Sequence, residues 1–434
     1  MDFRHLIVTC LFSMLRLSFE TQKIKENYAI LYKKRTGSFE NGLTYSPNDI
    51  RDKGYIVLRS SNIQNSKMNY EDTVYVESVP NDLLVKKGDI IICSRNGSAS
   101  LVGKCAKFDG KIAATFGAFM MRYSPSINNE YAFFSFQILM RNYKGLFTTS
   151  TINQLTKNVI AQMVCPLPPL SEQQAIASYL DAKTEKIDKM IAKAEKKIEY
   201  LGELKQSLIT RAVTRGLNPN ASLKDSGVKW IGKVPEHWET IKLSRVYSYI
   251  GSGTTPLSSQ EDYYSEEGYN WLQTGDLNNG LITQTSKKIT KKAIDECRMK
   301  FYPKHSVVIA MYGATIGKVG LLDLESTTNQ ACCVISPTQK MNPLFTFYSF
   351  MAAKKELLLA SFGGGQPNIS QDIIKKLRVP VPPLEEQNAI ILSLKKECDT
   401  IDHIIATQKK KIAYLQELKQ SLITNVVTGK IKVS

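Results

Sequence analysis

The sequence predicts an α+β protein in which two globular domains are joined by two long helices that form an antiparallel intramolecular coiled coil. Three observations lead to this prediction. A block of 47 residues occurs twice, apolar residues recur through each copy with a mean spacing of 3.5, and the segment before each copy mixes short apolar runs with Gly, Asn and Ser turns. The chain is therefore expected to be a pseudo-two-fold tandem repeat.

The repeated block begins at Pro168 and returns at Pro382, an offset of 214 residues. Within it 27 of the 47 positions are identical, and the segment ELKQSLIT returns unchanged. The same offset continues into the preceding segments only as scattered matches, so each repeat combines a divergent region with a nearly invariant one. The predicted domains are residues 1–167 and 217–381, and the predicted helical segments are residues 168–216 and 382–434.

Each copy of the block is predicted to be one helix of about 44 residues, about 65 Å long. Alternating steps of four and three along it select a mostly apolar stripe, which is the pattern of a coiled-coil seam. The predicted seam consists of Leu180, Ile187, Ile191, Ile198, Leu201 and Leu208 in the first helix and Leu394, Ile401, Ile405, Ile412, Leu415 and Leu422 in the second. Pairing of the two helices within the chain is the economical solution, and pairing of each with another chain is the alternative, because heptads alone fix neither the orientation nor the partner.

The ends of the helices are marked by local signals. A Pro-Pro pair precedes each block, and Ser171 with Gln174 three residues later forms a capping-box pattern in the first copy. Gly216 and Gly429 stand where a glycine just beyond a helix end is expected.

Charge and cysteine content limit the class of protein. The formal net charge is +17, with 57 Lys and Arg against 40 Asp and Glu, which favours a polyanionic partner over a role in solubility alone. The 8 cysteines form no C-x-x-C pair and the 4 histidines are scattered, so we expect a cytoplasmic protein without a zinc site. The apolar run Leu6–Leu15 is too short to span a bilayer, and no membrane association is predicted.

Two apolar runs, at Asp89–Cys93 and Ser306–Met311, are predicted strands, and each leads into a glycine-containing turn. These turns are Arg95–Lys104 and Tyr312–Gly320. A nucleotide-binding P-loop is rejected because the glycine spacing is wrong and no Ser or Thr follows the lysine. Such turns can place backbone N–H groups and a cation against phosphate while a neighbouring side chain reaches a base edge. A plain structural turn is the alternative.

Other polar positions differ between the repeats in the way that a changed base preference requires. Arg59 and Asn62 of the first repeat correspond to Gln273 and Asp276 of the second. Loops near the end of each divergent region add further amides. The candidate DNA contacts are Arg59, Asn62, Arg95, Asn96, Gly97, Ser98, Lys104 and Asn153 in the first repeat, and Thr254, Gln273, Asp276, Tyr312, Gly313, Thr315, Lys318, Gln366 and Asn368 in the second.

The usual short catalytic motifs are missing. The sequence contains no Walker motif, no H-E-x-x-H, no N-P-P-[FY] tetrapeptide and no paired Cys/His ligands, and no carboxylate pattern of a nuclease recurs in both repeats. Together with the duplicated frame this favours a non-catalytic binding subunit without a metal or a cofactor of its own. The alternatives are a DNA methyltransferase or nuclease with fused recognition domains, and a structural coiled-coil scaffold.

Four motifs resemble one protein family. PPLSEQQAI with its second copy PPLEEQNAI, the repeated ELKQSLIT, WIGKVPEHW at 230–238 and YGATIGK at 312–318 are similar to the DNA specificity subunit of type I restriction-modification systems. The resemblance covers both helices, nearly all of the second repeat and most of the first. At residues 16–24, where a counterpart of WIGKVPEHW is expected, the chain reads RLSFETQKI, which predicts an atypical and incomplete start of the first domain.

The resemblance implies a function. In that family two target-recognition domains each read one half of a bipartite, asymmetric site in double-stranded DNA, and the antiparallel helices set the spacer. The helices also bind two modification subunits, which methylate adenine with S-adenosylmethionine, and the assembly recruits restriction subunits that use ATP and Mg. By motif, Tyr312, Gly313, Thr315 and Lys318 become candidates for DNA contact, as do Arg95, Gly97, Ser98 and Lys104. The helix faces outside the seam become candidates for the methyltransferase interface.

Overall fold

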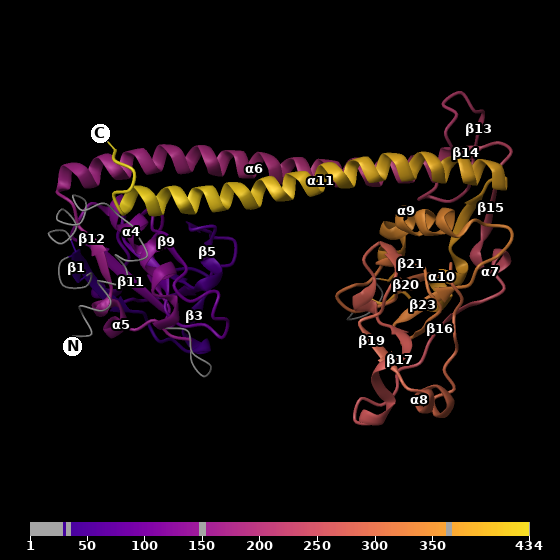
Figure 1. The fold of residues 1–434 in the computed structure, drawn as a ribbon, viewed down its shortest axis with the longest axis horizontal. Coiled ribbons are helices and arrows are strands. Elements are labelled where there is room, and N and C mark those ends of the chain that lie inside the picture. Colours follow the sequence, from indigo (N-terminus) through magenta and orange to yellow (C-terminus); the bar gives the residue numbers. More distant parts are fainter. Residues whose placement is uncertain (1–28, 32–35, 147–152, 362–366, 434) are drawn as a thin grey trace. The chain divides into compact units, whose positions relative to one another are not determined.

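The computed structural model describes residues 29–31, 36–146, 153–361 and 367–433 (Figure 1). The chain divides into two compact units: the first comprises Met1–Lys193 with Lys411–Ser434, and the second comprises Ala194–Lys410. Each unit has an α+β domain, the first part of one long helix and the last part of the other. The atypical N-terminal segment that the sequence singles out, residues 16–24, lies outside the described residues.

The two long helices are α6 (Leu170–Arg215) and α11 (Leu384–Val427). Gly216 and Gly429 follow their last turns with φ of 69° and 73°, the left-handed conformation that glycine adopts without steric cost, so the predicted ends are confirmed. The predicted capping box is wrong. Ser171 already lies within the first turn of α6, and the side chain of the next buried residue, Gln173, instead donates to Pro168 O at 2.8 Å.

The helices pair antiparallel, as predicted. In the first unit, Asp188 near the middle of α6 contacts Lys419 near the end of α11. In the second unit, Lys205 near the end of α6 contacts Asp402 near the middle of α11. In each unit the start of one helix therefore lies beside the end of the other, and the same contact recurs at the offset of 214.

The predicted seam lies on the inner faces of the helices. Leu180, Ile187, Leu394, Ile401 and Leu415 are buried, and the other seven predicted positions are half-buried. Near the end of each helix the fully buried positions are instead Ile209, Val213, Ile423 and Val426. The strict heptad fails there because the helix ends also pack against the globular domains, which requires an apolar face wider than a coiled-coil seam.

The first unit is built from short strands around two cores. Its strands are β1 (Ala29–Leu31), β2 (Gly37–Asn41), β3 (Ile50–Arg51), β4 (Tyr55–Leu58), β5 (Ile63–Gln64), β6 (Lys67–Met68), β7 (Tyr75–Val76), β8 (Ile90–Cys93), β9 (Cys105–Lys107), β10 (Ala114–Phe116), β11 (Met120–Pro125) and β12 (Val164–Pro166). Its shorter helices are α4 (Asn129–Asn142) and α5 (Lys157–Gln162), with a 3₁₀ turn η2 (Ser60–Asn62). The larger sheets have the orders β2-β11-β8-β9 and β10-β4-β7-β3.

Strand β8 is an uninterrupted apolar run because both of its faces are buried. Ile90 and Ile92 enter one core, which α4 covers, whereas Ile91 and Cys93 enter the other, shared with β4 and β10. Alternate side chains of a strand point to opposite faces, so a strand buried on both faces has no polar alternation. The sheet that carries β8 is therefore a central layer with a core on each face. The chain reaches the surface just after β8, since Ser94 is buried and Arg95 is exposed.

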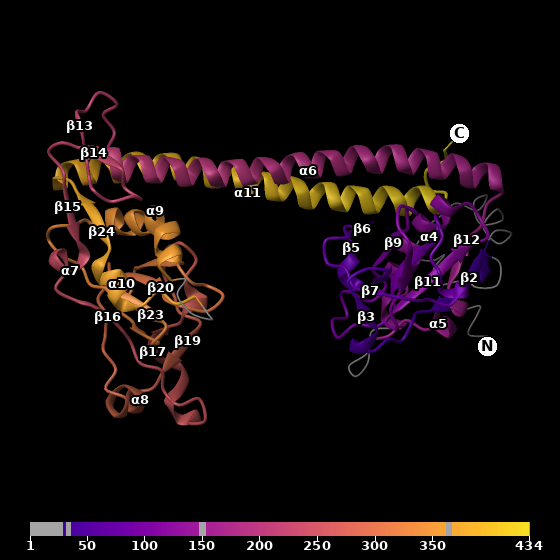
Figure 2. The same cartoon turned by 180° about the vertical axis from the view of Figure 1, so that it is seen from behind.

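The second unit repeats this plan. Its strands are β13 (Leu223–Asp225), β14 (Lys233–Pro235), β15 (Glu239–Lys242), β16 (Ile250–Ser252), β17 (Tyr264–Leu272), β18 (Gly280–Ile282), β19 (Lys287–Ile289), β20 (Val307–Ala310), β21 (Val319–Leu322), β22 (Thr327–Thr328), β23 (Cys332–Ile335) and β24 (Arg378–Val381). Its helices are α7 (Leu243–Val246), α8 (Lys291–Glu296), α9 (Pro343–Ser361) and α10 (Gln371–Lys376), with a 3₁₀ turn η6 (Thr274–Asp276). The main sheet has the order β16-β23-β20-β21-β18, and Figure 2 shows α10 beside β16.

Strand β20 matches β8. Val307 and Ile309 enter the core that includes α9, and Val308 and Ala310 enter the core on the opposite face of the sheet. Matched buried glutamines also join each domain to its long helix. Gln173 accepts from Asn128 N at 3.1 Å, and Gln387, 214 residues later, accepts from Asn342 N at 2.8 Å.

Candidate nucleic-acid interface

The two predicted glycine turns occupy equivalent positions. After β8, Gly103 N donates to Cys93 O at 2.9 Å, and after β20, Gly317 N donates to Ala310 O at the same distance. The following lysines, Lys104 and Lys318, accept through their carbonyl groups from the same two strand residues. Nine residues separate Cys93 from Gly103, whereas six separate Ala310 from Gly317. The turns thus share their closure but differ in length and side chains.

In the first unit the turn begins with an arginine stacked on an aromatic ring. The Arg95 guanidinium lies 5.5 Å from the centroid of the Phe119 ring. The Phe119 side chain is 61% exposed, which is unusual for a large hydrophobic residue between two buried strands. The backbone fixes both residues, since Ser94 N and Arg95 N donate to Phe119 O at 3.0 and 3.1 Å.

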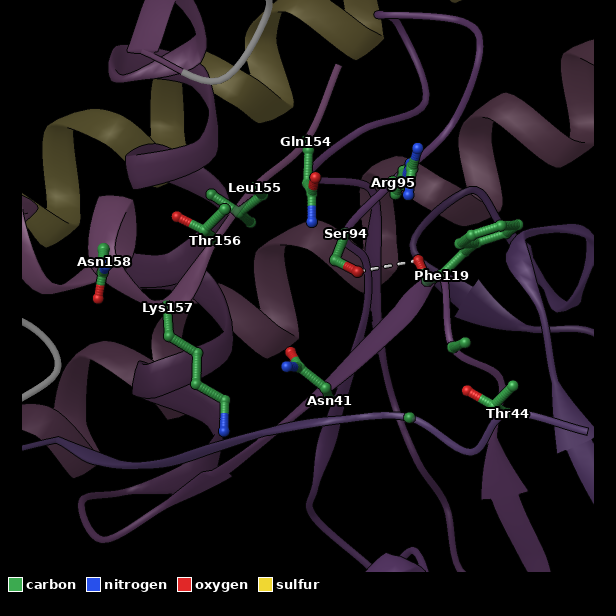
Figure 3. A pocket seen from close by; sticks show the side chains of 12 residues that line it. Asn41, Thr44, Ser94, Arg95, Phe119, Gln154, Leu155, Thr156, Lys157 and Asn158 are labelled. Carbon is green, nitrogen blue, oxygen red and sulfur yellow. Dashed lines mark hydrogen bonds between the residues drawn. The ribbon is translucent and has the colours of Figure 1, made fainter. Parts of the chain in front are cut away.

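A pocket of about 490 Å³ opens beside this pair (Figure 3). It lies between the turn, the end of β2 and the start of α5. Its lining residues are Asn41, Gly42, Thr44, Ser94, Arg95, Ala118, Phe119, Gln154, Leu155, Thr156, Lys157 and Asn158. The amides of Asn41, Gln154 and Asn158 are exposed, and Lys157 Nζ donates to Glu40 at 3.0 Å. The lining is therefore mainly polar and offers both donors and acceptors.

The structure brings the predicted loop before α5 to the turn. Asn153 Nδ2 donates to Gly97 O at 3.3 Å, and Leu155 N donates to Ser94 O at 2.7 Å. Asn96 shapes the turn itself, because its side-chain oxygen accepts from Ser98 N at 2.9 Å. Two of the candidate amides, Asn96 and Asn153, thus hold the loop conformation, and Gly97 and Ser98 remain exposed on it.

The second unit presents Tyr312, Gly313, Thr315 and Lys318 on its shorter turn. Tyr312 is half-buried and packs against the domain core, while Gly313 is exposed with a φ of 81°. Ile369 N donates to Met311 O at 2.8 Å, which brings the exposed Asn368 close to the turn. Thr254 is held by its backbone, which donates to Thr328 O at 2.9 Å. Gln366 lies outside the described residues.

Two of the candidate DNA contacts have the same structural role in the two units. Asn62 and Asp276 are the third residues of η2 and η6, and each accepts a backbone N–H across its turn, from Arg59 at 2.8 Å and Gln273 at 2.9 Å. Asn62 is fully buried and its amide also donates to two backbone carbonyl groups. Its expected contact with DNA therefore does not fit this conformation, because burial removes the side chain from any ligand.

Arg59 and Lys104 lie on either side of η2. Arg59 forms an ion pair with Asp72 at 2.7 Å, and Lys104 Nζ donates to Ser60 O at 3.2 Å. Both are half-buried. The cation of Arg59 is paired with a carboxylate and that of Lys104 is hydrogen-bonded to a carbonyl group, which distinguishes both from Arg95.

The thiols beside the turns are buried. Burial raises the pKa of Cys105 to about 12, and burial raises the pKa of Cys333 to about 12 as well. These thiols are therefore neutral at physiological pH and lack the thiolate that nucleophilic chemistry requires. Among the described residues, no group of three or more His, Cys, Asp or Glu side chains is arranged to hold a metal ion.

Sequence reasoning missed Phe119, Asn41, Gln154 and Asn158. Phe119 stands in the run FGAFMMRY, which reads as one buried apolar segment, and only the tight turn between β10 and β11 exposes it. The three amides lie far apart in the sequence, and only the packing of α5 against β2 gathers them at one pocket.

Comparison with known proteins gives consistent similarities. A family model described as type I restriction modification DNA specificity domain matches residues 36–200 and 235–415. The specificity subunit of the type I restriction enzyme MjaVIII from Methanocaldococcus jannaschii is 26% identical over 371 residues, covering 83% of each chain. The EcoKI specificity subunit of Escherichia coli K12 is 24% identical over 432 residues, covering 94% of this chain and 90% of its own.

A chain in a solved structure, described as the structural basis of complex assembly and conformational transition of the type I R-M system, has a similar fold. Its TM-score is 0.65 at 18% identity, covering 91% of this chain and 98% of its own. None of the described helices combines the length and apolar character needed to cross a membrane.

Proposed function

Because the chain belongs to the type I restriction-modification DNA specificity family, it is a DNA-recognition specificity subunit, and we propose that it reads a bipartite, asymmetric site in double-stranded DNA. Residues 1–167 would read one half-site and residues 217–381 the other. The observation that carries this proposal is the pair of matched turns after β8 and β20, which close through the same backbone hydrogen bonds but present different side chains.

Equivalent scaffold positions with different polar groups are what two different half-sites require, since base edges are distinguished by their pattern of donors and acceptors. Arg95 corresponds to Tyr312, and Arg59 corresponds to Gln273. The net charge of +17 supplies the sequence-independent attraction to phosphate that accompanies such contacts.

We further propose that two modification subunits bind the long helices α6 and α11. Each unit carries a matched exposed apolar pair on one helix face: Tyr200 and Leu204 of α6, and Tyr414 and Leu418 of α11. These four side chains are between 41% and 64% exposed and recur at the offset of 214. Exposed apolar pairs that are preserved in both copies have no role in the seam, so they fit two equivalent partner contacts.

A groove adjoins the first pair in the second unit. It has a volume of about 900 Å³ and is lined by one face of α6 and the segment Lys229–Gly232. Trp230 is one of these lining residues, and its indole N–H is buried without a hydrogen-bond partner among the described residues. In the proposed assembly, methylation of adenine with S-adenosylmethionine and cleavage dependent on ATP and Mg belong to the modification and restriction subunits.

The decisive experiment is to coexpress the chain with its modification subunit and to map methylated adenines across the host genome. We expect one split motif, present only when both proteins are made. Methylation by the isolated chain supplied with DNA and methyl donor would instead identify a fused methyltransferase.

The salt dependence of DNA binding distinguishes a specificity subunit from a structural scaffold. Affinity of the assembled complex for DNA should fall steeply between 50 and 200 mM salt, by as much as about 10³-fold if six phosphates are contacted. DNA binding that is absent, or that does not respond to salt, would support a scaffold.

A further inference from the structure

The Arg95–Phe119 pair has the features of a base-reading element. We propose that Arg95 recognises a guanine in the half-site read by the first unit, an inference that rests on the proposed function and adds a specific base and a specific residue to it. The Arg95 side chain is exposed, lies over the Phe119 ring at 5.5 Å and stands at the mouth of the polar pocket of Figure 3.

The guanidinium of Arg95 is free to bind a ligand. No hydrogen bond or ion pair of its side chain occurs among the described residues, where Arg59 is paired with Asp72 and Arg51 with Glu77. An unpaired arginine keeps its planar fork of donors available, and that fork matches the O6 and N7 acceptors of guanine in the major groove.

The pair is also held in position before any ligand binds. The Phe119 carbonyl accepts hydrogen bonds from Ser94 N, Ser94 Oγ and Arg95 N, all between 3.0 and 3.1 Å. Arg95 additionally forms an isolated antiparallel bridge with Gln154. Stacking on the ring restricts the guanidinium plane, so less conformational entropy is lost on binding than for a free surface arginine.

The surroundings favour a base over a phosphate. The exposed amides of Asn41, Gln154 and Asn158 line the same pocket, and the one lysine there, Lys157, is paired with Glu40. A phosphate site would gather several free cations, whereas amides with both donors and acceptors suit the edges of neighbouring bases.

The second unit lacks this element. Leu155 N binds Ser94 O in the first unit and Ile369 N binds Met311 O in the second, so the residue that follows, Arg95, corresponds to Tyr312. A tyrosine hydroxyl cannot make two parallel donor contacts. The guanine preference is therefore assigned to one half-site only.

The test uses the complex of the full chain with its modification subunit, and DNA duplexes that carry the wild-type split motif or single base-pair changes in it. We expect Arg95→Ala to abolish discrimination at one G·C pair of one half-site, a loss of about 5- to 150-fold, with the other half-site read as before. Arg141→Ala, which removes an exposed arginine of the same domain at the end of α4, is the matched control and should leave the motif unchanged.

Phe119→Leu provides a second variant, because it keeps the Arg95 side chain but removes the ring that restrains it, and it should weaken discrimination at the same base pair. Preserved reading of the second half-site shows that a variant folds and assembles. Equal weakening on all sequences, with the salt dependence reduced by about one phosphate contact, would make Arg95 a phosphate ligand and overturn the inference.

Two further outcomes separate this inference from the proposed function. A wild-type split motif that Arg95→Ala leaves intact would overturn the assignment of Arg95 alone. A wild-type complex with no split sequence preference would overturn the proposed function, and this inference with it.

Discussion

The Lys205 ammonium on α6 lies 2.6 Å from the Asp402 carboxylate on α11, and the same pair recurs at an offset of 214 as Lys419 with Asp188, also at 2.6 Å. Both lysines occupy positions of the apolar stripe. Such a pair stabilises the coiled coil less than apolar residues at both positions would, and removal of one partner leaves the other charge unpaired. The pair nevertheless specifies orientation and register, because the lysine charge needs a partner at one level of the facing helix. The repeated pair therefore explains why the two copies select the antiparallel arrangement.

Replacement of either lysine should destabilise the chain, and by different amounts. The Asp188 side chain is 25% exposed and that of Asp402 is 54% exposed, so solvent screens the second pair more. We expect Lys419→Met to lower the free energy of unfolding by about 1 kcal/mol and Lys205→Met by about half as much. Urea denaturation at low and high salt measures both, and the larger loss should shrink at high salt.

The charge-reversed pair Lys205→Asp with Asp402→Lys is the control, because Asp188 also pairs with Lys67 and could not be reversed alone. It should recover most of the lost stability if the pair acts through its opposite charges. Equal losses in the two single lysine variants, or no recovery in the reversed pair, would contradict this account.

Gln387, a buried polar residue in the first turn of α11, should be important for stability. It is fully buried, accepts from Asn342 N and donates to Pro382 O and Lys340 O, so Gln387→Ala removes the side-chain partner of three backbone groups. We expect a loss of about 1 to 3 kcal/mol in the free energy of unfolding. Gln174→Ala, which removes one exposed hydrogen bond to Asn128, should cost under about 0.5 kcal/mol. Similar losses in the two variants would show that burial of Gln387 is unimportant.

The glycine that closes each turn should tolerate alanine to different degrees. Gly103 and Gly317 both have positive φ, which costs an alanine about 1 kcal/mol. A Cβ at Gly103 would meet Met140 Sδ at 3.0 Å, whereas at Gly317 the nearest atoms are those of Lys354 at 3.5 Å. Gly103→Ala should therefore lower the thermal midpoint further than Gly317→Ala.

Gly97→Ala serves as the control for both variants. A Cβ there meets nothing within 4 Å, so the midpoint should hardly change. A greater loss at Gly317 than at Gly103 would contradict the steric explanation.

The matched exposed pairs on the long helices predict the stoichiometry of the complex. Charged substitutions Tyr200→Asp and Leu204→Asp should remove one modification subunit, and the same changes at Tyr414 and Leu418 should remove the other, because each surface would lose its apolar contact. Native mass spectrometry of the coexpressed complex would show one subunit lost in each case and both lost in the combined variant.

Leu359→Asp is the matched control, since it changes a 59% exposed leucine on α9 rather than on a long helix. It should leave both subunits bound. Loss of both subunits from either double variant alone would indicate a single shared surface.

Much of the fold was predictable from local patterns. The repeat, the heptad spacing, Gly216 and Gly429 predict the lengths, ends and pairing of α6 and α11, because helix periodicity and termination depend on neighbouring residues. The apolar runs at β8 and β20 predict strands buried on both faces, and the turns after them share their closure.

The sequence by itself determined the duplicated frame, the two long helices and the two equivalent turns. Only the tertiary structure decided which polar residues are available to a ligand. Asn62 is buried as a cap and Ser171 lies inside α6, whereas Phe119 is exposed beneath an unpaired Arg95. Periodicity and capping act over a few residues, but exposure and pairing depend on contacts between segments that are far apart in the sequence, such as β2, α5 and the turn after β8.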